Sequence, residues 1–185
     1  PVIKKAAIIQ AAVKLFAERG IEGTTTREIS QLAGTAEGTM FRHFESKEDL
    51  AWQIYHENLT QFMSDLEADV ARQSSTRARL RAMVERCYTL YENNPTLCTF
   101  LLLSEHSAAR RMSRDYRTPI QVLIEVIEAG RESGELGPLE PMLAAALVFG
   151  AVLRVPIFKV YGRLSGDLRD KVDAVTEAVW KLLRA

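Results

Sequence analysis

The sequence is poor in cysteine and has no net charge. Its 185 residues include only Cys87 and Cys98, and 24 basic side chains balance 24 acidic ones. Two cysteines form neither a disulfide framework nor a metal-binding motif, and both lie in apolar stretches. We therefore interpret them as small buried side chains of a protein from a reducing cytosol. The balanced charge gives no overall reason to expect a polyanionic partner.

The chain also lacks a secretory signal sequence and a long apolar run. The longest run, Met142 to Leu153, is too short to span a bilayer and ends at Arg154. Motifs of common enzymes are missing too, since there is no glycine-rich phosphate loop, no H-E-x-x-H and no G-x-S-x-G. No two of the three histidines have metal-ligand spacing. We expect a cytoplasmic protein that is not an enzyme and uses no cofactor or metal.

The strongest local pattern lies in residues 20–50. Residues 25–28, TTRE, form a capping box in which Thr25 and Glu28 bond reciprocally through side chain and backbone. A helix therefore starts at about Thr26 and is stopped by Gly34. A second short helix is expected over residues 37–44, and a long one follows a further cap at residues 46–49. Two helices joined by a short turn containing glycine make a helix-turn-helix.

This stretch also contains a more specific pattern, in which particular residue types recur at fixed spacings. The residues are Gly20, Thr24, Thr25, Ile29, Ala33, Gly34, Gly38, Phe41, His43, Phe44, Lys47 and Leu50. In these positions the sequence resembles the DNA-binding segment of the TetR family of bacterial transcriptional regulators. Two positions depart from the family's usual pattern. Thr35 replaces the commonest valine, and Ala36 stands where a capping serine is common. Ala36 cannot cap the second helix, so that helix either starts without a side-chain cap or is helped by Thr35.

The resemblance implies which residues face DNA: Thr26, Arg27, Glu37, Gly38, Thr39, Phe41, Arg42, His43 and Lys47. Arg42 is the best candidate for reading a base, because arginine pairs bidentately with guanine. Glu37 either accepts from cytosine N4 or merely favours a helix N-terminus, and both readings stay open. Phe41 replaces the family's usual tyrosine, whose hydroxyl donates to a phosphate, so Phe41 is expected only to pack against sugar.

The remaining chain shows helical periodicity and no period-two strand pattern. Further helices are expected over residues 3–19, 47–72, 76–92, 97–103, 115–133, 139–162 and 167–184, with a kink at Pro156. We predict an all-α fold in two domains. Residues 1–48 form a three-helix DNA-binding domain with the helix-turn-helix. Residues 49–185 form a larger antiparallel helical bundle for ligand binding and dimerisation, joined to the first domain by a continuous helix near Leu50.

Adaptable and aromatic side chains between residues 55 and 127 predict a mostly apolar ligand pocket, since ligand sites have apolar walls with few polar groups. The candidate lining residues are Phe62, Met63, Met83, Cys87, Tyr88, Tyr91, Phe100, His106 and Met112. A packed core of the same residues is the alternative. Basic side chains recur at helical spacing at His106, Arg110, Arg114 and Arg117. This basic series could be a solvated helix face, a contact between domains or an anchor for an anionic ligand, and all three interpretations stay open.

The helix over residues 139–162 is apolar nearly all round, and such a helix must be buried. A second subunit is the simplest cover, with the candidate interface residues Phe149, Leu153, Leu168, Val172, Val175 and Val179. A two-fold dimer would also present two recognition helices about 34–36 Å apart, one turn of DNA. The sequence thus predicts a TetR-like homodimeric repressor that binds a palindromic operator and is released by a small apolar ligand. The alternative is a helical ligand-binding or scaffold protein without specific DNA binding, which the zero net charge favours.

Overall fold

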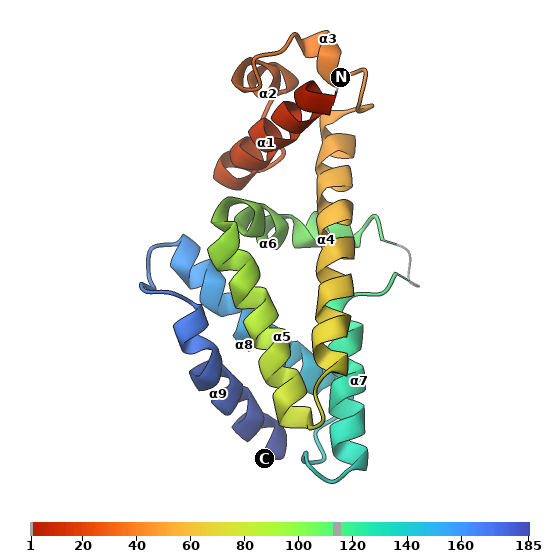
Figure 1. Cartoon of the computed structure of the whole chain (residues 1–185), viewed down its shortest axis with the longest axis vertical. Coiled ribbons are helices and arrows are strands. Elements are labelled where there is room, and N and C mark those ends of the chain that lie inside the picture. The colour runs from red at the N-terminus through yellow and green to blue at the C-terminus, as the bar shows by residue number, and fades with distance from the viewer. Residues whose placement is uncertain (1, 113–115) are drawn as a thin grey trace. The chain divides into compact units, whose positions relative to one another are not determined.

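The computed structural model describes residues 2–112 and 116–185, without the side chains of Val2, His106 and Ala109. Within these ranges the chain is helical and contains no strand, so the predicted all-α fold is confirmed (Figure 1). The helices are α1 (Val2–Arg19), α2 (Thr26–Leu32), α3 (Glu37–Met40), α4 (Lys47–Ala71), α5 (Thr76–Asn93), α6 (Pro95–Ala109), α7 (Pro119–Glu132), α8 (Pro141–Val160), the short 3-10 helix η1 (Arg169–Lys171) and α9 (Val172–Arg184).

Three helices start at a proline instead of at their predicted first residue: α6, α7 and α8, which begins at Pro141 and was expected from residue 139. The helix expected over residues 97–103 is α6, which begins at Pro95, where the Asn94 side chain accepts from the amide of Leu97 at 3.1 Å. The helix expected from residue 115 is α7, which begins at Pro119 after the capping residue Thr118. Proline suits the first helical position because its missing amide would have no intrahelical partner there. Residues 93–95, which were predicted only to end α5, therefore also begin α6.

The recognition helix and the last helix also differ from their predicted bounds. The recognition helix α3 ends at Met40, not at residue 44, because the next turn tightens and the amide of His43 donates to the carbonyl of Met40 at 2.9 Å. The last predicted helix is divided into η1 and α9. Pro156 lies inside α8, which continues to Val160; the kink there stays a prediction.

The chain forms two compact units. The first contains Pro1–Thr60 and Asn94–Met112, and the second contains Gln61–Asn93 and Ser113–Ala185. This grouping by contacts differs from the predicted division at residue 48, because α6 packs on α1 in the first unit. The buried core of the first unit includes Ile8, Ala12, Phe16, Ile29, Met40, Phe44, Leu50, Ile54 and Phe100.

The second unit is a helical bundle in which α5 packs against α7, α8 and α9 (Figure 1). Its buried side chains include Leu66, Leu80, Val84, Tyr88, Leu123, Ile127, Ala144, Val148, Leu168, Val172, Val179 and Leu183. The hydroxyl of Tyr88 donates to the carbonyl of Val152 at 3.3 Å, so the one polar atom of this fully buried ring has a partner. Burial also raises the pKa of Tyr88 above its ordinary value.

Candidate DNA-binding and ligand sites

The first helix of the predicted helix-turn-helix starts at the predicted capping box. The Thr25 hydroxyl accepts from the Glu28 amide at 3.2 Å, and the Thr25 amide donates to Glu28 Oε2 at 2.9 Å. Arg19, the last residue of α1, donates to Glu28 Oε1 at 3.0 Å. The Thr25 hydroxyl also donates to Glu28 Oε2 at 2.8 Å, and the hydrogen bonds that this carboxylate accepts, those from Thr25 first, lower the pKa of Glu28. The box therefore fixes the start of α2 and ties it to the end of α1.

The turn after α2 has the predicted geometry. Gly34 has a φ of +63°, a left-handed conformation that glycine adopts without a steric penalty. Ala36 is the N-cap residue of α3 and makes no side-chain cap, as predicted. Thr35 does not take over that role, because its buried hydroxyl has no hydrogen-bond partner. The recognition helix thus begins without a side-chain cap.

The burial pattern of α3 and the following turn separates a core side from an outward side. Met40 is fully buried and Phe44 is 3% exposed. Phe41 is 51% exposed, although it is large and apolar, and Glu37, Gly38 and Arg42 are also exposed. Thr39 and His43 are half-buried. An exposed arginine is able to reach base edges, and an exposed aromatic ring offers apolar contact area.

The remaining predicted DNA-facing residues flank α3. Arg27 is exposed, and in the described part of the chain neither Arg27 nor Arg42 forms an ion pair. Thr26 is half-buried, and its hydroxyl donates to Glu37 Oε1. Lys47 keeps only 17% of its side chain exposed and lies 3.6 Å from Glu48 Oε1. Two unpaired guanidinium groups are therefore available at this surface, while Lys47 is partly covered.

The predicted cap at residues 46–49 is confirmed at the start of α4. The Ser46 hydroxyl accepts from the Asp49 amide at 3.0 Å, and Asp49 Oδ2 accepts from the Glu45 amide at 3.1 Å. Arg111, just past the end of α6, donates to the carbonyl of Glu48 at 2.9 Å and lies over the Trp52 ring at 5.3 Å. The start of α4 is thus held by its own cap and by Arg111, both within the first unit.

The second unit contains a small, partly open cavity of about 40 Å³. Its lining residues are Leu66, Leu80, Met83, Val84, Cys87, Pro119, Leu123, Val148, Phe149, Val152, Leu153 and Val179. Every lining side chain is apolar apart from the thiol of Cys87, whose pKa is raised by burial to about 12 and which is therefore neutral at pH 7. Such a cavity can take only a hydrocarbon group, because a polar group inside it would have no partner.

The structure divides the predicted ligand residues among several places. Met83 and Cys87 line the cavity. Phe100 and Met112 pack in or against the core of the first unit. Met63, Tyr88 and Tyr91 are buried and Phe62 is half-buried, but none of these four lines the cavity. The side chain of His106 lies outside the described residues.

The lining residues that the sequence reading missed belong to α4, α5, α7, α8 and α9. Phe149, Leu153 and Val179 were assigned to the dimer interface instead. Periodicity marked these residues as buried without indicating what covers them.

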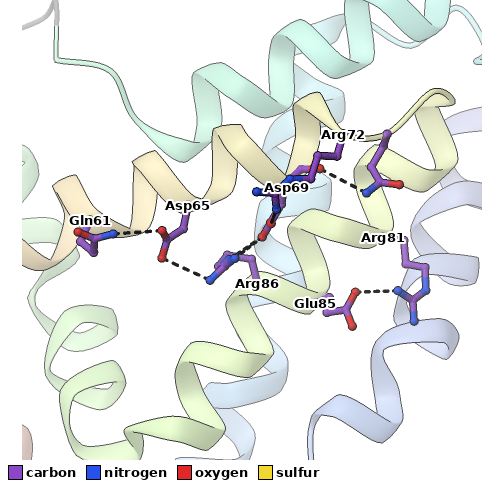
Figure 2. Close-up of polar contacts among 8 residues, drawn as sticks. Gln61, Asp65, Asp69, Arg72, Arg81, Glu85 and Arg86 are labelled. Carbon is purple, nitrogen blue, oxygen red and sulfur yellow. Dashed lines mark hydrogen bonds and ion pairs between the residues drawn. The ribbon is translucent and has the colours of Figure 1, made fainter.

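A polar cluster lies beside the cavity on α4 and α5 (Figure 2). Arg86 Nε donates to Asp69 Oδ2 at 2.7 Å, and a second nitrogen of the same guanidinium lies 3.4 Å from Asp65 Oδ2. The chain neighbours of these ionic residues, Leu66 next to Asp65 and Cys87 next to Arg86, line the cavity. The ion pairs therefore join α4 and α5, the two helices that carry these lining residues.

The predicted basic series does not lie on one helix. α6 ends at Ala109 and α7 begins at Pro119, so Arg110 and Arg117 belong to the connection between them. Arg114 lies outside the described residues. Arg117 donates to Glu125 Oε1 at 2.7 Å and Glu125 Oε2 at 2.9 Å, and it also pairs with Glu67. These carboxylates raise the pKa of Arg117 further and neutralise its charge within the second unit.

The candidate interface residues differ in how far a single chain already buries them. Leu168, Val172 and Val179 are at most 3% exposed within a single chain, so they are already covered, whereas Phe149, Leu153 and Val175 are half-buried. The exposed apolar side chains of α8 and its end are Met142, Leu143, Leu147, Phe158 and Tyr161, between 44% and 58% exposed. By length and composition alone α8 is long and apolar enough to cross a membrane, and in this structure it packs against α7 and α9.

Known families match both parts of the chain. Residues 8–54 match the model described as bacterial regulatory proteins of the tetR family, and residues 55–185 match the model described as the tetracyclin repressor-like C-terminal domain. The helix-turn-helix and the helical bundle thus define a DNA-binding transcriptional regulator. The chain belongs to the TetR family.

Related proteins are regulators, not enzymes. The fatty acid metabolism regulator protein of Bacillus subtilis is 27% identical over 150 residues, which cover 78% of this chain and 77% of the relative. The repressor KstR2 of Rhodococcus jostii is 34% identical over 85 residues, 46% of this chain and 42% of that protein.

Solved structures share the fold. FadR of Bacillus halodurans, a fatty acid degradation regulator, has a TM-score of 0.82 at 24% identity and covers 96% of this chain and 94% of its own. FadR of Bacillus subtilis, solved in complex with stearoyl-CoA, has a TM-score of 0.76 at 22% identity and covers 94% of this chain and 96% of its own.

Proposed function

We propose that this TetR-family regulator is a cytoplasmic repressor that binds a palindromic operator as a homodimer and leaves it when a ligand with a long hydrocarbon part binds. The surface of the helix-turn-helix is the observation that supports operator binding, the first part of this proposal. There, Arg27 and Arg42 are exposed and form no ion pair with any described residue, and the Phe41 ring is 51% exposed. Unpaired guanidinium groups favour phosphate and guanine, and the ring supplies contact area against sugar.

The homodimer would use the exposed apolar face of α8. Leu143, Leu147 and Phe158 lie on one side of the helix, because their spacings are close to whole numbers of helical turns. Exposed apolar side chains gathered on one side of a helix favour an interaction site there. A two-fold axis through this face would bring two copies of α8 together and give the two recognition helices that a palindromic operator requires.

The ligand would occupy an enlarged form of the cavity in the second unit. The present volume of about 40 Å³ is far below the roughly 300–1,000 Å³ of typical ligand sites. Binding must therefore separate the walls, and α4 with Leu66 forms one of them. A relative of the same fold is solved with stearoyl-CoA, and an acyl chain suits these walls because they offer hydrocarbon and no charge. By linkage, such a ligand must bind the DNA-free form more tightly than the DNA-bound form.

The second candidate, a helical ligand-binding protein without specific DNA affinity, is favoured by the zero net charge of the chain. The two candidates differ in one experiment. Stearoyl-CoA is titrated calorimetrically into the free protein and into protein saturated with a duplex that the wild type has selected from a randomised pool. We expect weaker binding in the presence of the duplex and no binding of coenzyme A alone. Equal affinity with and without DNA would contradict release by ligand, and failure to select any sequence would favour the second candidate.

A further inference from the structure

The start of the recognition helix has little to hold it in place. α3 has four residues, too few to be stable by themselves, and its N-cap residue Ala36 makes no side-chain hydrogen bond. The hydroxyl of Thr35, the residue before it, has no partner. The other end is anchored, since Met40 is fully buried in the core of the first unit. Some other contact must fix the angle at which α3 leaves the turn.

The structure provides one such contact, between the first residue of α2 and the first residue of α3. The Thr26 hydroxyl donates to Glu37 Oε1. Within the described part of the chain, this is the only side-chain hydrogen bond that a residue of α3 makes. Thr26 is itself well placed, because the capping box of Thr25 and Glu28 fixes the start of α2. The bond therefore connects a rigid helix start to an uncapped one.

This contact bears on the role of Glu37. A threonine hydroxyl has one proton to donate, and Thr26 gives it to Glu37. The carboxylate is thereby tied to the start of α2 through Oε1, so its position is set by α2. We propose that Glu37 is a positioning residue, which acts through Thr26 to hold the start of the recognition helix against α2, and that it does not read a base. The proposal rests on the proposed DNA-binding function, and it assigns Thr26 a second role besides any phosphate contact.

The charge of Glu37 acts in the opposite direction from its hydrogen bond. A carboxylate at a surface that approaches phosphates lowers affinity for DNA of every sequence, because like charges repel. The hydrogen bond raises affinity, because it keeps the recognition helix in position. The variant Glu37→Gln removes the charge and keeps an acceptor oxygen, whereas Glu37→Ala removes both. Comparing these two neutral variants isolates the hydrogen bond from the charge.

The test is a cycle of four proteins, in which Glu37→Gln and Glu37→Ala are each made with Thr26 and with Thr26→Val. Affinity is measured by fluorescence anisotropy for the duplex selected by the wild type and for a scrambled duplex. With Thr26 present, Glu37→Gln should bind the selected duplex about fivefold more tightly than Glu37→Ala, the effect of one net hydrogen bond. When both proteins also carry Thr26→Val, the ratio should fall to about one. Glu37→Gln should keep the wild-type preference at every operator position.

Two outcomes would overturn the proposal. If the ratio were the same with Thr26 and with Thr26→Val, Glu37 would act without Thr26. If Glu37→Gln and Glu37→Ala both lost preference at one base pair, Glu37 would read that base.

A second readout needs no DNA, so it separates this proposal from the proposed function. Amide hydrogen exchange at residues 37–40 of the free protein should be faster in Glu37→Ala and Thr26→Val and unchanged in Glu37→Gln and Thr26→Ser. Equal exchange in all four would contradict the positioning role. A wild type that bound DNA without sequence preference would instead contradict the proposed function alone.

Discussion

The rings of Phe16 in α1 and Phe100 in α6 stack with their centroids 5.7 Å apart. Both side chains are 1% exposed. Through this contact α6, which follows α5 in the chain, completes the core of the unit that contains the helix-turn-helix. The support of the DNA-binding surface thus includes a helix outside the first 60 residues.

Removing the Phe100 ring should destabilise the protein. Phe100→Ala is expected to lower the free energy of unfolding by about 3–5 kcal/mol, because it leaves a cavity in a packed core. Urea denaturation followed by circular dichroism measures this, with Phe62→Ala, a half-buried site, as the control that should cost less. A loss under about 1 kcal/mol for Phe100→Ala would show that α6 contributes little to this core.

Arg42 and Lys47 should differ in what they recognise. Arg42→Ala is expected to weaken operator binding by about 1–3 kcal/mol per half-site and to relax preference at one base position. Lys47→Ala should weaken all sequences alike and reduce the salt slope by about one per lysine. Binding is measured by anisotropy on single-base variants of the selected duplex over a range of salt. If Arg42→Ala left sequence preference unchanged, Arg42 would contact phosphate instead of a base.

The exposed face of α8 should be the dimer interface. Leu147→Glu is expected to give monomers in sedimentation velocity and to abolish operator binding, since a charge would then be buried between the subunits without a partner. Leu103→Glu is the matched control, because Leu103 is 50% exposed on α6, in the other unit, and Leu147 is 44% exposed. A dimeric Leu147→Glu protein would place the interface elsewhere.

The ion pairs of Arg86 should resist opening of the cavity. Arg86→Gln is expected to lower the free energy of unfolding by about 1–2 kcal/mol, because it removes charged hydrogen bonds and leaves Asp65 and Asp69 facing each other. It should also tighten stearoyl-CoA binding in calorimetry, since separating α4 from α5 then costs less.

Arg81 provides the control for this prediction. It lies on the same helix and pairs with Glu85 (Figure 2). It also pairs with Asp173 of α9, so its printed ion pairs do not involve α4. Arg81→Gln should leave ligand affinity unchanged. If Arg86→Gln and Arg81→Gln changed ligand affinity equally, the ion pairs of Arg86 would have no specific role in opening the cavity.

Local chemistry explains why the helix-turn-helix could be predicted from the sequence. The capping box of Thr25 and Glu28, the left-handed Gly34 and the missing cap at Ala36 depend on a few neighbouring residues, and all three are present. The start of α6 was missed because Asn94 and Pro95 suit both the end of one helix and the beginning of the next.

Tertiary partners were harder to predict. An apolar stripe shows that Leu168 and Val179 are buried, but not that the covering surface belongs to the same chain. For the same reason Phe100 and Met112 were assigned to a ligand pocket, although they pack in the first unit. Contacts between residues distant in sequence, such as that of Thr26 with Glu37, leave no periodic signal at all.

The most direct test of the central claim is a gel shift with the DNA upstream of the protein's own coding sequence, because regulators of this family often lie beside their operators. The wild type should shift this fragment at concentrations that leave a scrambled fragment free. The affinity should fall linearly with salt concentration on logarithmic axes, and Arg42→Ala should lose the preference for the upstream fragment. Equal binding to both fragments by the wild type, or no binding to either at low salt, would contradict the account.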